Sequence, residues 1–230
     1  MRISTMMTAA AIVALAPVAA MAQDSVAYNA APNDGWLYGS GNDYSPANSV
    51  VLTTDNSDQL YLRWHVTYEP SPASSNTGLY QFTSDQFDLS SDHSLSFDWG
   101  FDTSGTGAFT SASLSIADLG AHTNVSYNAI DPFNTGFNIN DNFTGNGSTQ
   151  NSERLSFPFI GSFDPNANDT YRVTLTVTGL DGGSRSLSAY AQVGTGAGAV
   201  PEPASWAMML GGFGLVGGAM RRRKAAVRFA

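Results

Sequence analysis

The sequence predicts an all-β protein: an antiparallel β-sandwich of about nine strands, jelly-roll-like in arrangement, with an N-terminal signal helix and a single C-terminal transmembrane helix. Apolar residues make up 42% of the chain and charged residues only 13%, so Ser, Thr, Asn and Gly supply most of the polarity. That balance favours strands, because Glu, Lys and Arg suit helix surfaces. Several segments also alternate apolar and polar residues with a period of two, which is typical of half-buried strands.

The clearest predicted strand lies in residues 59–69. Its apolar face holds Leu60, Leu62, Trp64, Val66 and Tyr68, and its polar face holds Tyr61, Arg63, His65 and Thr67. Residues 95–101 alternate in the same way, with Leu95, Phe97, Trp99 and Phe101 opposite Ser96, Asp98 and Gly100. Two further strands, at 171–177 and 187–193, flank Asp181-Gly182-Gly183, which supplies the positive φ angles of a hairpin turn. Weaker patterns predict strands at 49–53, 80–83, 112–117, 125–130 and 154–160.

The chain of 230 residues divides into four predicted parts. Residues 1–22 are a signal peptide, 23–193 a single sandwich ectodomain, 194–200 a flexible Gly-rich spacer, and 201–230 a sorting signal with a basic tail. There is no cysteine, which excludes disulfides, thiolate metal sites and a cysteine nucleophile. The ectodomain therefore depends on its own apolar core for stability.

Charge is unevenly distributed along the chain. Residues 23–200 contain 18 acidic residues and four arginines, a net charge of −14, whereas the full chain carries −9. An acidic body repels nucleic acid, since that affinity depends on Lys and Arg neutralising phosphates. We therefore expect no nucleic-acid partner, and no cofactor is indicated.

The N-terminus has the pattern of a secretory signal. Arg2 precedes an uncharged, largely apolar stretch at 6–18, and Ala20 and Ala22 form an A-x-A cleavage site. The mature chain is expected to begin at Gln23. An uncleaved anchor helix is the alternative, although the stretch is short and Pro17 interrupts it.

The C-terminus combines an extended motif, an apolar run and a cluster of cations. Residues 204–220 are uncharged and would span ~26 Å as a helix, a short match to a ~30 Å hydrocarbon core. The cations Arg221, Arg222, Arg223 and Lys224 are predicted to stay cytoplasmic as an anchor, which places the acidic body outside the inner membrane.

The residues Pro201-Glu202-Pro203 and Trp206-Ala207, followed by this run and its cations, resemble a PEP-CTERM sorting signal of the PEPxxWA subtype. The resemblance covers about thirty residues and none of the body. It implies an exopolysaccharide-producing Gram-negative source and an exosortase that cleaves the tail at the inner membrane. Pro201, Glu202, Pro203, Trp206 and Ala207 are then recognition residues for that enzyme. An anchor that is never cleaved is the alternative.

No catalytic site or metal site is predicted in the body, and we expect that the protein is not an enzyme. His65, His93 and His122 lie far apart in sequence, and His65 is expected at the surface. A glycosidase needs two neighbouring carboxylates. The candidates for that role are Asp85, Asp88, Asp92, Asp98 and Asp102, which are more simply interpreted as solvated side chains.

Two binding sites are weighed against simpler structural roles. Asp164, Asn166 and Asn168 have the spacing of half a calcium loop, but such residues before a strand more often form turns, and the Asn-rich segment 137–147 is interpreted in the same way. Trp36, Tyr38 and Tyr44 suggest a sugar platform, although packing over one end of the sandwich is favoured.

Together these patterns predict an exported protein of the cell envelope, cell surface or extracellular matrix. By the resemblance, its partners are the exosortase, the inner membrane and extracellular polysaccharide, and its role is binding or structural. The alternatives are a glycan-acting hydrolase, a calcium-dependent carbohydrate-binding module, and a membrane-tethered periplasmic protein with an uncleaved tail.

Overall fold

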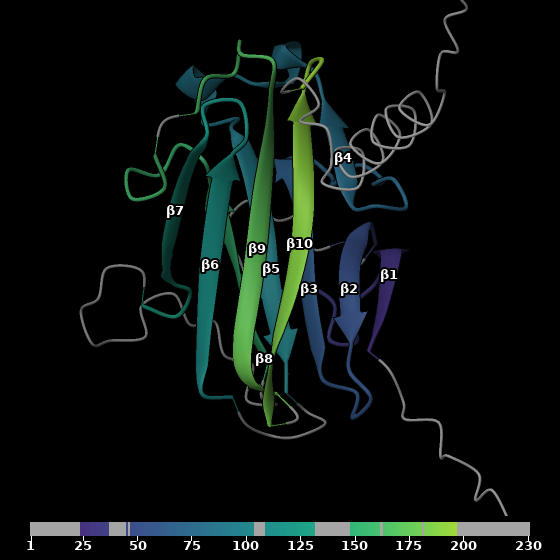
Figure 1. Ribbon diagram of the computed structural model, residues 1–230. Coiled ribbons are helices and arrows are strands. Elements are labelled where there is room, and N and C mark those ends of the chain that lie inside the picture. Colours follow the sequence, from purple (N-terminus) through teal and green to yellow (C-terminus); the bar gives the residue numbers. More distant parts are fainter. Residues whose placement is uncertain are drawn as a thin grey trace, which may run out of the picture.

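The computed structural model describes residues 24–36, 45, 47–103, 109–131, 148–161, 163–180 and 182–196. Within these residues the chain forms ten strands and two short 3-10 helices. The strands make two five-stranded sheets that pack face to face as a sandwich (Figure 1). The all-β sandwich predicted from the alternating segments is therefore confirmed.

The first sheet has the strand order β1-β2-β3-β5-β8. Its strands are β1 (Ser25–Ala30), β2 (Ser49–Thr53), β3 (Gln59–Val66), β5 (Leu95–Asp102) and β8 (Ser148–Arg154). The second sheet has the order β4-β10-β9-β6-β7. Its strands are β4 (Leu79–Phe82), β10 (Gly183–Val193), β9 (Asp169–Leu180), β6 (Ser111–Asp118) and β7 (Thr123–Asn128). The 3-10 helices Ser84–Gln86 and Leu89–Ser91 connect β4 to β5.

The core lies between the sheets and is built by the apolar faces that the alternation predicts. Trp64 of β3 lies opposite Phe97 of β5, and their rings meet edge to face at 5.3 Å between centroids. Both side chains are fully buried in one cluster with Val173 and Leu175 of β9. Burying large apolar side chains in this way is the dominant favourable contribution to folding.

The strand order differs from the arrangement that we expected. The three successive strands β1, β2 and β3 form an antiparallel meander within one sheet, which is not a jelly-roll order. The sandwich is also not purely antiparallel, because β4 pairs with β10 in parallel. A parallel neighbour needs a long connection between the two strands. Here most of the ectodomain separates them, a relation that local alternation does not predict.

The predicted hairpin between β9 and β10 is confirmed. The two strands pair antiparallel from Val193↔Asp169 to Gly183↔Leu180, and Gly182 in the connection has φ +69°. Only a residue without a Cβ adopts this conformation at little cost. Asp181 lies outside the described residues.

Three local predictions need correction. Strand β1 was not predicted; its alternation of Val26, Tyr28 and Ala30 is short and lies at the sheet edge, where most of its residues face solvent. The predicted strand at 154–160 is wrong: β8 ends at Arg154, and turns close between Phe157 and Arg154 and between Ile160 and Phe157. Tyr68 does not join the core, because β3 ends at Val66; the Tyr68 side chain is 56% exposed.

The terminal segments are not part of this description. The signal peptide at 1–22, the spacer residues 197–200 and the segment 201–230 lie outside the described residues, so the signal helix and the helix at 204–220 stay predictions. Among the residues described, no helix has the length and apolar character to cross a bilayer.

Candidate functional site

The residues assigned to processing and sorting lie outside the described part of the chain. They are Ala20, Ala22 and Gln23 at the signal cleavage site, Pro201, Glu202, Pro203, Trp206 and Ala207 of the sorting motif, and the anchor residues Arg221, Arg222, Arg223 and Lys224. Their roles stay as predicted from the sequence. The described residues offer two other places of interest, namely a buried polar face and a pocket.

The outer face of the first sheet is polar and yet buried. In β3 and β5 every residue is buried, on both faces of the sheet. Arg63 and Asp98 are partners across the β3–β5 ladder, and their side chains are only 1% and 0% exposed. Ser152 of β8 pairs with Asp98 on the other side. A buried charge is tolerated only where it is paired and hydrogen-bonded.

A network of hydrogen bonds satisfies these charges. The Nε of Arg63 donates to Oδ2 of Asp98 at 2.6 Å, and Nε2 of His65 lies 3.1 Å from Oδ1 of the same carboxylate. The Nδ1 of His65 lies 2.8 Å from the carbonyl oxygen of Val66. Both ring nitrogens therefore face acceptors, the arrangement that suits a doubly protonated imidazolium.

The pKa directions agree with this geometry. Burial on its own lowers the pKa of His65, but the Asp98 carboxylate and the Val66 carbonyl outweigh it, so the pKa of His65 lies above its ordinary value. Burial on its own raises the pKa of Asp98, but His65, Arg63 and the Ser152 hydroxyl outweigh it, so the pKa of Asp98 lies below its ordinary value. Each charge thus stabilises the other.

Two predictions about this face are wrong. His65 was expected at the surface, and Asp98 and Asp102 in solvent, yet all three are buried. The reason is that residues from the β1–β2 connection lie on the outer face. Arg63 lies 4.8 Å below the ring of Trp36, and its Nη1 donates to the carbonyl oxygen of Ser45 at 2.5 Å. A cation over an indole ring is a favourable contact.

This network does not have the order of a catalytic triad. A triad needs an imidazole that contacts the acid through one nitrogen and the nucleophile through the other. Here the Ser152 hydroxyl lies 3.5 Å from Nε2 of His65, the nitrogen that already contacts Asp98. Nδ1 is engaged by the backbone. The network therefore has the properties of a structural ion cluster.

Trp36 is not available as a sugar platform. It is 2% exposed, packs edge to face against Tyr61 at 5.0 Å, and donates from Nε1 to Ser49 at 2.9 Å. We had favoured packing over one end of the sandwich. Trp36 instead packs over the outer face of the first sheet. Tyr38 and Tyr44 lie outside the described residues.

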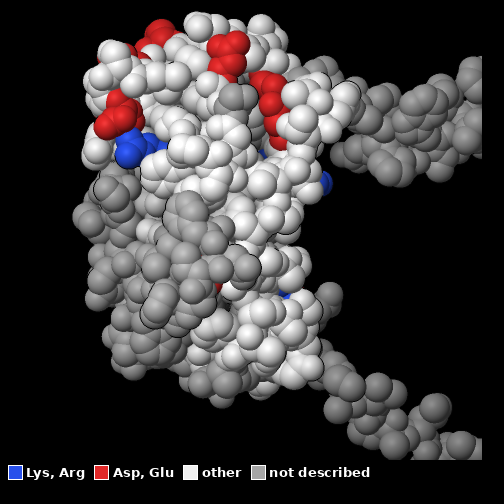
Figure 2. Space-filling model, turned by 90° about the vertical axis from the view of Figure 1, so that its left-hand side faces the viewer, with Lys and Arg blue, Asp and Glu red and all other residues white. Residues whose placement is uncertain are grey.

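The acidic residues suggested for a glycosidase pair do not converge. Asp85, Asp88 and Asp92 are exposed. Asp98 and Asp102 are buried four residues apart on one strand, which separates them by ~13 Å. That separation exceeds the ~5 to 9.5 Å that glycoside hydrolysis requires. Figure 2 shows acidic side chains gathered instead at the end of the sandwich that carries the 3-10 helices.

Several of these exposed acids have local structural partners. Asp88 accepts hydrogen bonds from the Ser90 amide and hydroxyl and from the Ser91 hydroxyl, and these bonds lower the pKa of Asp88. Asp92 pairs with Arg154 at 3.1 Å. The solvated role expected for both is consistent with these contacts.

The remaining histidines do not join a site with His65. His93 bonds to the Ser91 hydroxyl at 2.9 Å and packs against Tyr68, while His122 is exposed in a turn with φ +56°. Within the described part of the chain, no three His, Asp or Glu side chains gather in an arrangement that would hold a metal ion.

The suggested calcium loop has the contacts of a turn. Oδ1 of Asp164 accepts from the Asn166 amide at 2.9 Å, and Oδ1 of Asn168 accepts from the Thr195 amide at 2.9 Å. Asx side chains commonly bond neighbouring backbone in this way. The contact of Asp164 is that of a turn former, whereas Asn168 bonds a distant segment rather than its own turn. The segment 137–147 lies outside the described residues.

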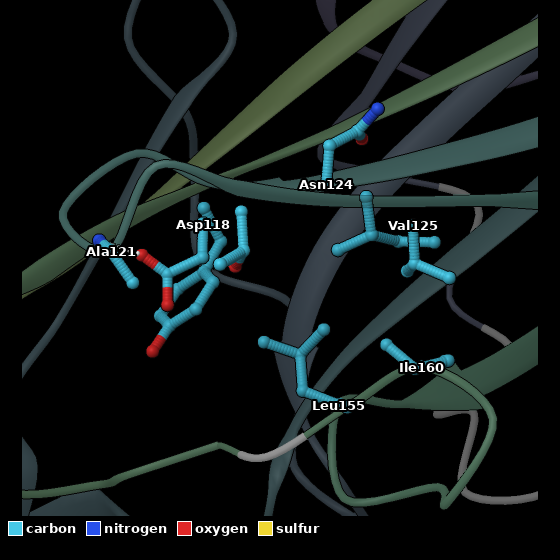
Figure 3. Close-up of a pocket in the computed structure, with 10 residues that line it drawn as sticks. Asp118, Ala121, Asn124, Val125, Leu155 and Ile160 are labelled. Carbon is cyan, nitrogen blue, oxygen red and sulfur yellow. Dashed lines mark hydrogen bonds between the residues drawn. The ribbon is translucent and has the colours of Figure 1, made fainter.

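A pocket of about 310 Å³ opens between the ends of β6 and β7 and the turn that follows β8 (Figure 3). Its inner wall is apolar and buried, formed by Ile116, Leu155, Ile160 and Tyr171. Its rim is more exposed and includes Asp118, Thr123, Asn124 and Val125. Small-molecule sites combine an apolar wall with a few polar groups in this way.

Two carboxylates meet at one end of this pocket. Asp118 ends β6 and Asp169 begins β9, and the two side chains are within hydrogen-bonding reach. Burial, together with the hydrogen bond to Asp118, raises the pKa of Asp169 above its ordinary value, against the opposing effect of the Thr170 and Gly120 amides. Asp118 in turn accepts from the Ala121 amide at 2.7 Å. The pair therefore also stabilises the β6–β7 turn.

Sequence reasoning missed both Asp118 and Asp169. They are 51 residues apart, and no motif links them. Only the antiparallel pairing of β6 with β9, which places Asp118 opposite Tyr171, brings them together. Glu153 was missed for the same reason: it is buried where it accepts from Nε1 of Trp99 at 2.8 Å and from the hydroxyl of Tyr127.

Comparison with known protein families matches residues 199–224 to the PEP-CTERM protein-sorting motif. No curated protein and no solved structure matches the chain. The match covers the motif, the apolar run and the cations on which the sequence resemblance rested. Proteins with this motif are exported and sorted to the cell surface. The chain therefore carries a C-terminal PEP-CTERM protein-sorting motif, which implies an exported exosortase substrate with a β-sandwich body.

Proposed function

We propose that the β-sandwich is a non-catalytic binding or structural module of an exopolysaccharide-rich extracellular matrix, delivered there by its sorting tail. The observation that carries the proposal is the PEP-CTERM motif at 199–224 attached to an acidic, cysteine-free sandwich. The tail serves to direct the protein to the surface, so the sandwich is the part that acts there. Its stability in that setting rests on the apolar core and the buried ion network.

The surface of the sandwich supports a polysaccharide partner rather than a polyanion. The partly exposed Arg154 and Arg185 each pair with a carboxylate of the body, and Arg63 is buried with Asp98. The outer face of the second sheet carries rows of hydroxyls, with Thr174 bonded to Ser188 and Thr176 bonded to Ser186, both at 2.8 Å. A hydroxyl-rich surface on an acidic body offers hydrogen bonds to a glycan and little attraction to phosphates.

The tail defines the other partners. Pro201 to Pro203 would lie in the exosortase cleft, 204–220 would cross the inner membrane, and Arg221 to Lys224 would anchor the segment on the cytoplasmic side. Intact mass of the protein purified from its own envelope tests this. A chain that ends near Pro203, with or without an adduct, supports processing. A chain running from Gln23 to Ala230 supports the uncleaved, membrane-tethered alternative.

Binding is tested with the full chain and with polysaccharide isolated from the same culture. Co-sedimentation at physiological and high salt should retain the protein in the polysaccharide pellet at both, because hydrogen-bonded glycan contacts are weakly screened. Absence of protein from the pellet under all conditions would overturn the proposed binding role. A variant with alanine at Pro201, Glu202 and Pro203 should stay in the membrane. That result would show that the motif is needed to deliver the protein to the matrix.

A glycan-acting hydrolase is the second candidate, favoured by the Asp118–Asp169 pair beside the pocket. These two carboxylates lie within hydrogen-bonding reach, closer than the ~5 Å of a retaining pair, and this spacing ranks the hydrolase behind the binding role. Release of reducing ends from the isolated polysaccharide, abolished by Asp118→Asn, would favour this candidate. Calcium-dependent binding, the third possibility, predicts that a chelator releases the protein from the polysaccharide pellet.

A further inference from the structure

The pocket between β6, β7 and the turn after β8 has two chemically different ends. Figure 3 shows Leu155 and Ile160 on one wall, across from Val125, with Asp118 and Ala121 at the far end. The apolar wall comes from residues that also belong to the core, so its shape is held by the packing of both sheets. A wall of this kind is largely preformed before a ligand arrives.

The polar end accepts hydrogen bonds and carries negative charge. Asp118 pairs with Thr123 across the β6–β7 ladder, so a carboxylate and a hydroxyl flank the same opening. The buried residue Asp169, which does not line the pocket, interacts with Asp118 through its carboxyl group. Tyr171 stays protonated, because burial and these two carboxylates raise the pKa of its hydroxyl. The end therefore suits donors such as hydroxyls and disfavours an anion.

We propose that this pocket binds one neutral pyranose ring, with the ring's C–H face on Leu155 and Ile160 and its hydroxyls donating to Asp118 and Thr123. A pyranose has the required combination of an apolar face and a hydroxyl edge. A purely apolar ligand would displace water from the Asp118 carboxylate and offer it no hydrogen bond in exchange. A uronic acid would bring its carboxylate toward Asp118. The inference rests on the proposed function, and it names the sugar class and the place of contact.

The size of the pocket sets the expected affinity. At about 310 Å³ it lies at the lower end of the range for small-molecule sites, which suits one ring rather than an oligosaccharide. A hexose of about 12 non-hydrogen atoms, at the binding efficiency per atom typical of drug-sized ligands, gives a Kd of about 2 mM. Polysaccharide binding would then depend on many such weak contacts along one chain.

The test uses methyl NMR spectra of the full chain titrated separately with glucose, galactose, mannose and glucuronate. At least one neutral hexose should shift the methyl signals of Ile116, Val125, Leu155 and Ile160 with a Kd in the low millimolar range, while signals of Val50 and Leu62 stay unchanged. Glucuronate should bind at least tenfold more weakly. No shift with any neutral hexose, or equal binding of glucuronate, would overturn the inference.

Matched variants locate the contact. Asp118→Asn removes the charge but keeps an oxygen for the Ala121 amide, and it should weaken hexose binding at least fivefold. Asp85→Asn makes the same charge change at an exposed position and should leave binding unchanged. Val125→Phe adds bulk at the pocket rim and should abolish binding independently of the carboxylate.

The same variants separate this inference from the proposed function. If wild type and both pocket variants co-sediment equally with the isolated polysaccharide, the pocket is not the contact and the inference fails, while the binding role stands. If wild type does not co-sediment at all, the proposed binding role itself fails. A loss of co-sedimentation in Asp118→Asn and Val125→Phe, but not in Asp85→Asn, supports both.

Discussion

The two sheets of the sandwich have the same alternating sequence pattern but different surroundings. In the second sheet, β9 and β10 alternate between buried and partly exposed residues over most of their length, as a half-buried strand should. In the first sheet, β3 and β5 are buried on both faces. The outward residues of β9 are mainly Thr, whereas those of β3 and β5 include Arg63, His65 and Asp98.

The difference teaches that alternation identifies which residues share a face but not what covers that face. The hydroxyls of the second sheet form short cross-strand bonds at a face that stays accessible. The charges of the first sheet lie under Trp36 and Ser45, so their polar groups must be satisfied by one another. We therefore expect that the polar side chains on the outer face of the first sheet are needed for stability, whereas those on the outer face of the second sheet can be substituted at little cost.

Asp98→Ala should produce the largest effect. It leaves the charges of Arg63 and His65 buried without their shared carboxylate, which should lower the free energy of unfolding by about 3–5 kcal/mol. Thr176→Ala on the outer face of the second sheet is the control and should cost no more than about 0.5 kcal/mol. Urea denaturation measures both. A similar small loss in the two variants would contradict the contrast between the sheets.

Gly100→Ala tests the packing on the buried outer face. A Cβ at this position would lie 2.3 Å from Cε2 of Tyr61, whose ring is buried and whose hydroxyl accepts from Gln150. Because the ring has little room to move, overpacking should cost about 1–3 kcal/mol of unfolding free energy. Ser113→Ala, on the exposed face of β6, should change stability little. An unchanged urea midpoint for Gly100→Ala would show that this face is loosely packed.

The pH dependence of stability isolates the charges of the network. His65 has a raised folded pKa, so its contribution is fully present below its unfolded pKa of ~6.5 and is lost as pH rises through the folded value. Asp98 has a lowered pKa, so its contribution is present above ~3.9 and is lost as pH falls through the folded value.

Comparison of wild type with His65→Gln isolates the contribution of His65 to the pH dependence of the free energy of unfolding. Above pH ~6.5 the free energy of unfolding of wild type should fall by up to ~1.4 kcal/mol per pH unit relative to the variant. Denaturation at pH 5.5, 7 and 8.5 measures the difference. Parallel profiles over this range would mean that folding does not raise the pKa of His65.

Thr174→Val should have the smallest effect. The Thr174 hydroxyl bonds to Ser188 at 2.8 Å on a face where water can replace it. The change in unfolding free energy should stay within about 0.5 kcal/mol, and the gain in β-branched apolar surface offsets part of the lost hydrogen bond. A loss above 1 kcal/mol in urea denaturation would mean that the second sheet is also covered.

The sequence predicted most strands and little of the site. Strand β2 was predicted with its observed ends, and β3, β5, β9 and β10 from their alternation, because an apolar face repeats within a few residues. Strand β1 was missed because its apolar alternation is short and, at the sheet edge, most of its residues stay exposed. Asp118, Asp169 and Glu153 could not be found in this way, because their partners come from other strands.

By itself, the sequence determined the all-β class and the C-terminal sorting motif, because both depend on residues close together along the chain. The tertiary structure decided that His65 and Asp98 are buried, that Trp36 packs over a sheet face, and that Asp118 and Asp169 meet beside a pocket. These features depend on which strands pair and which segment covers a face. Such choices arise from the packing of the whole core, and no local pattern encodes them.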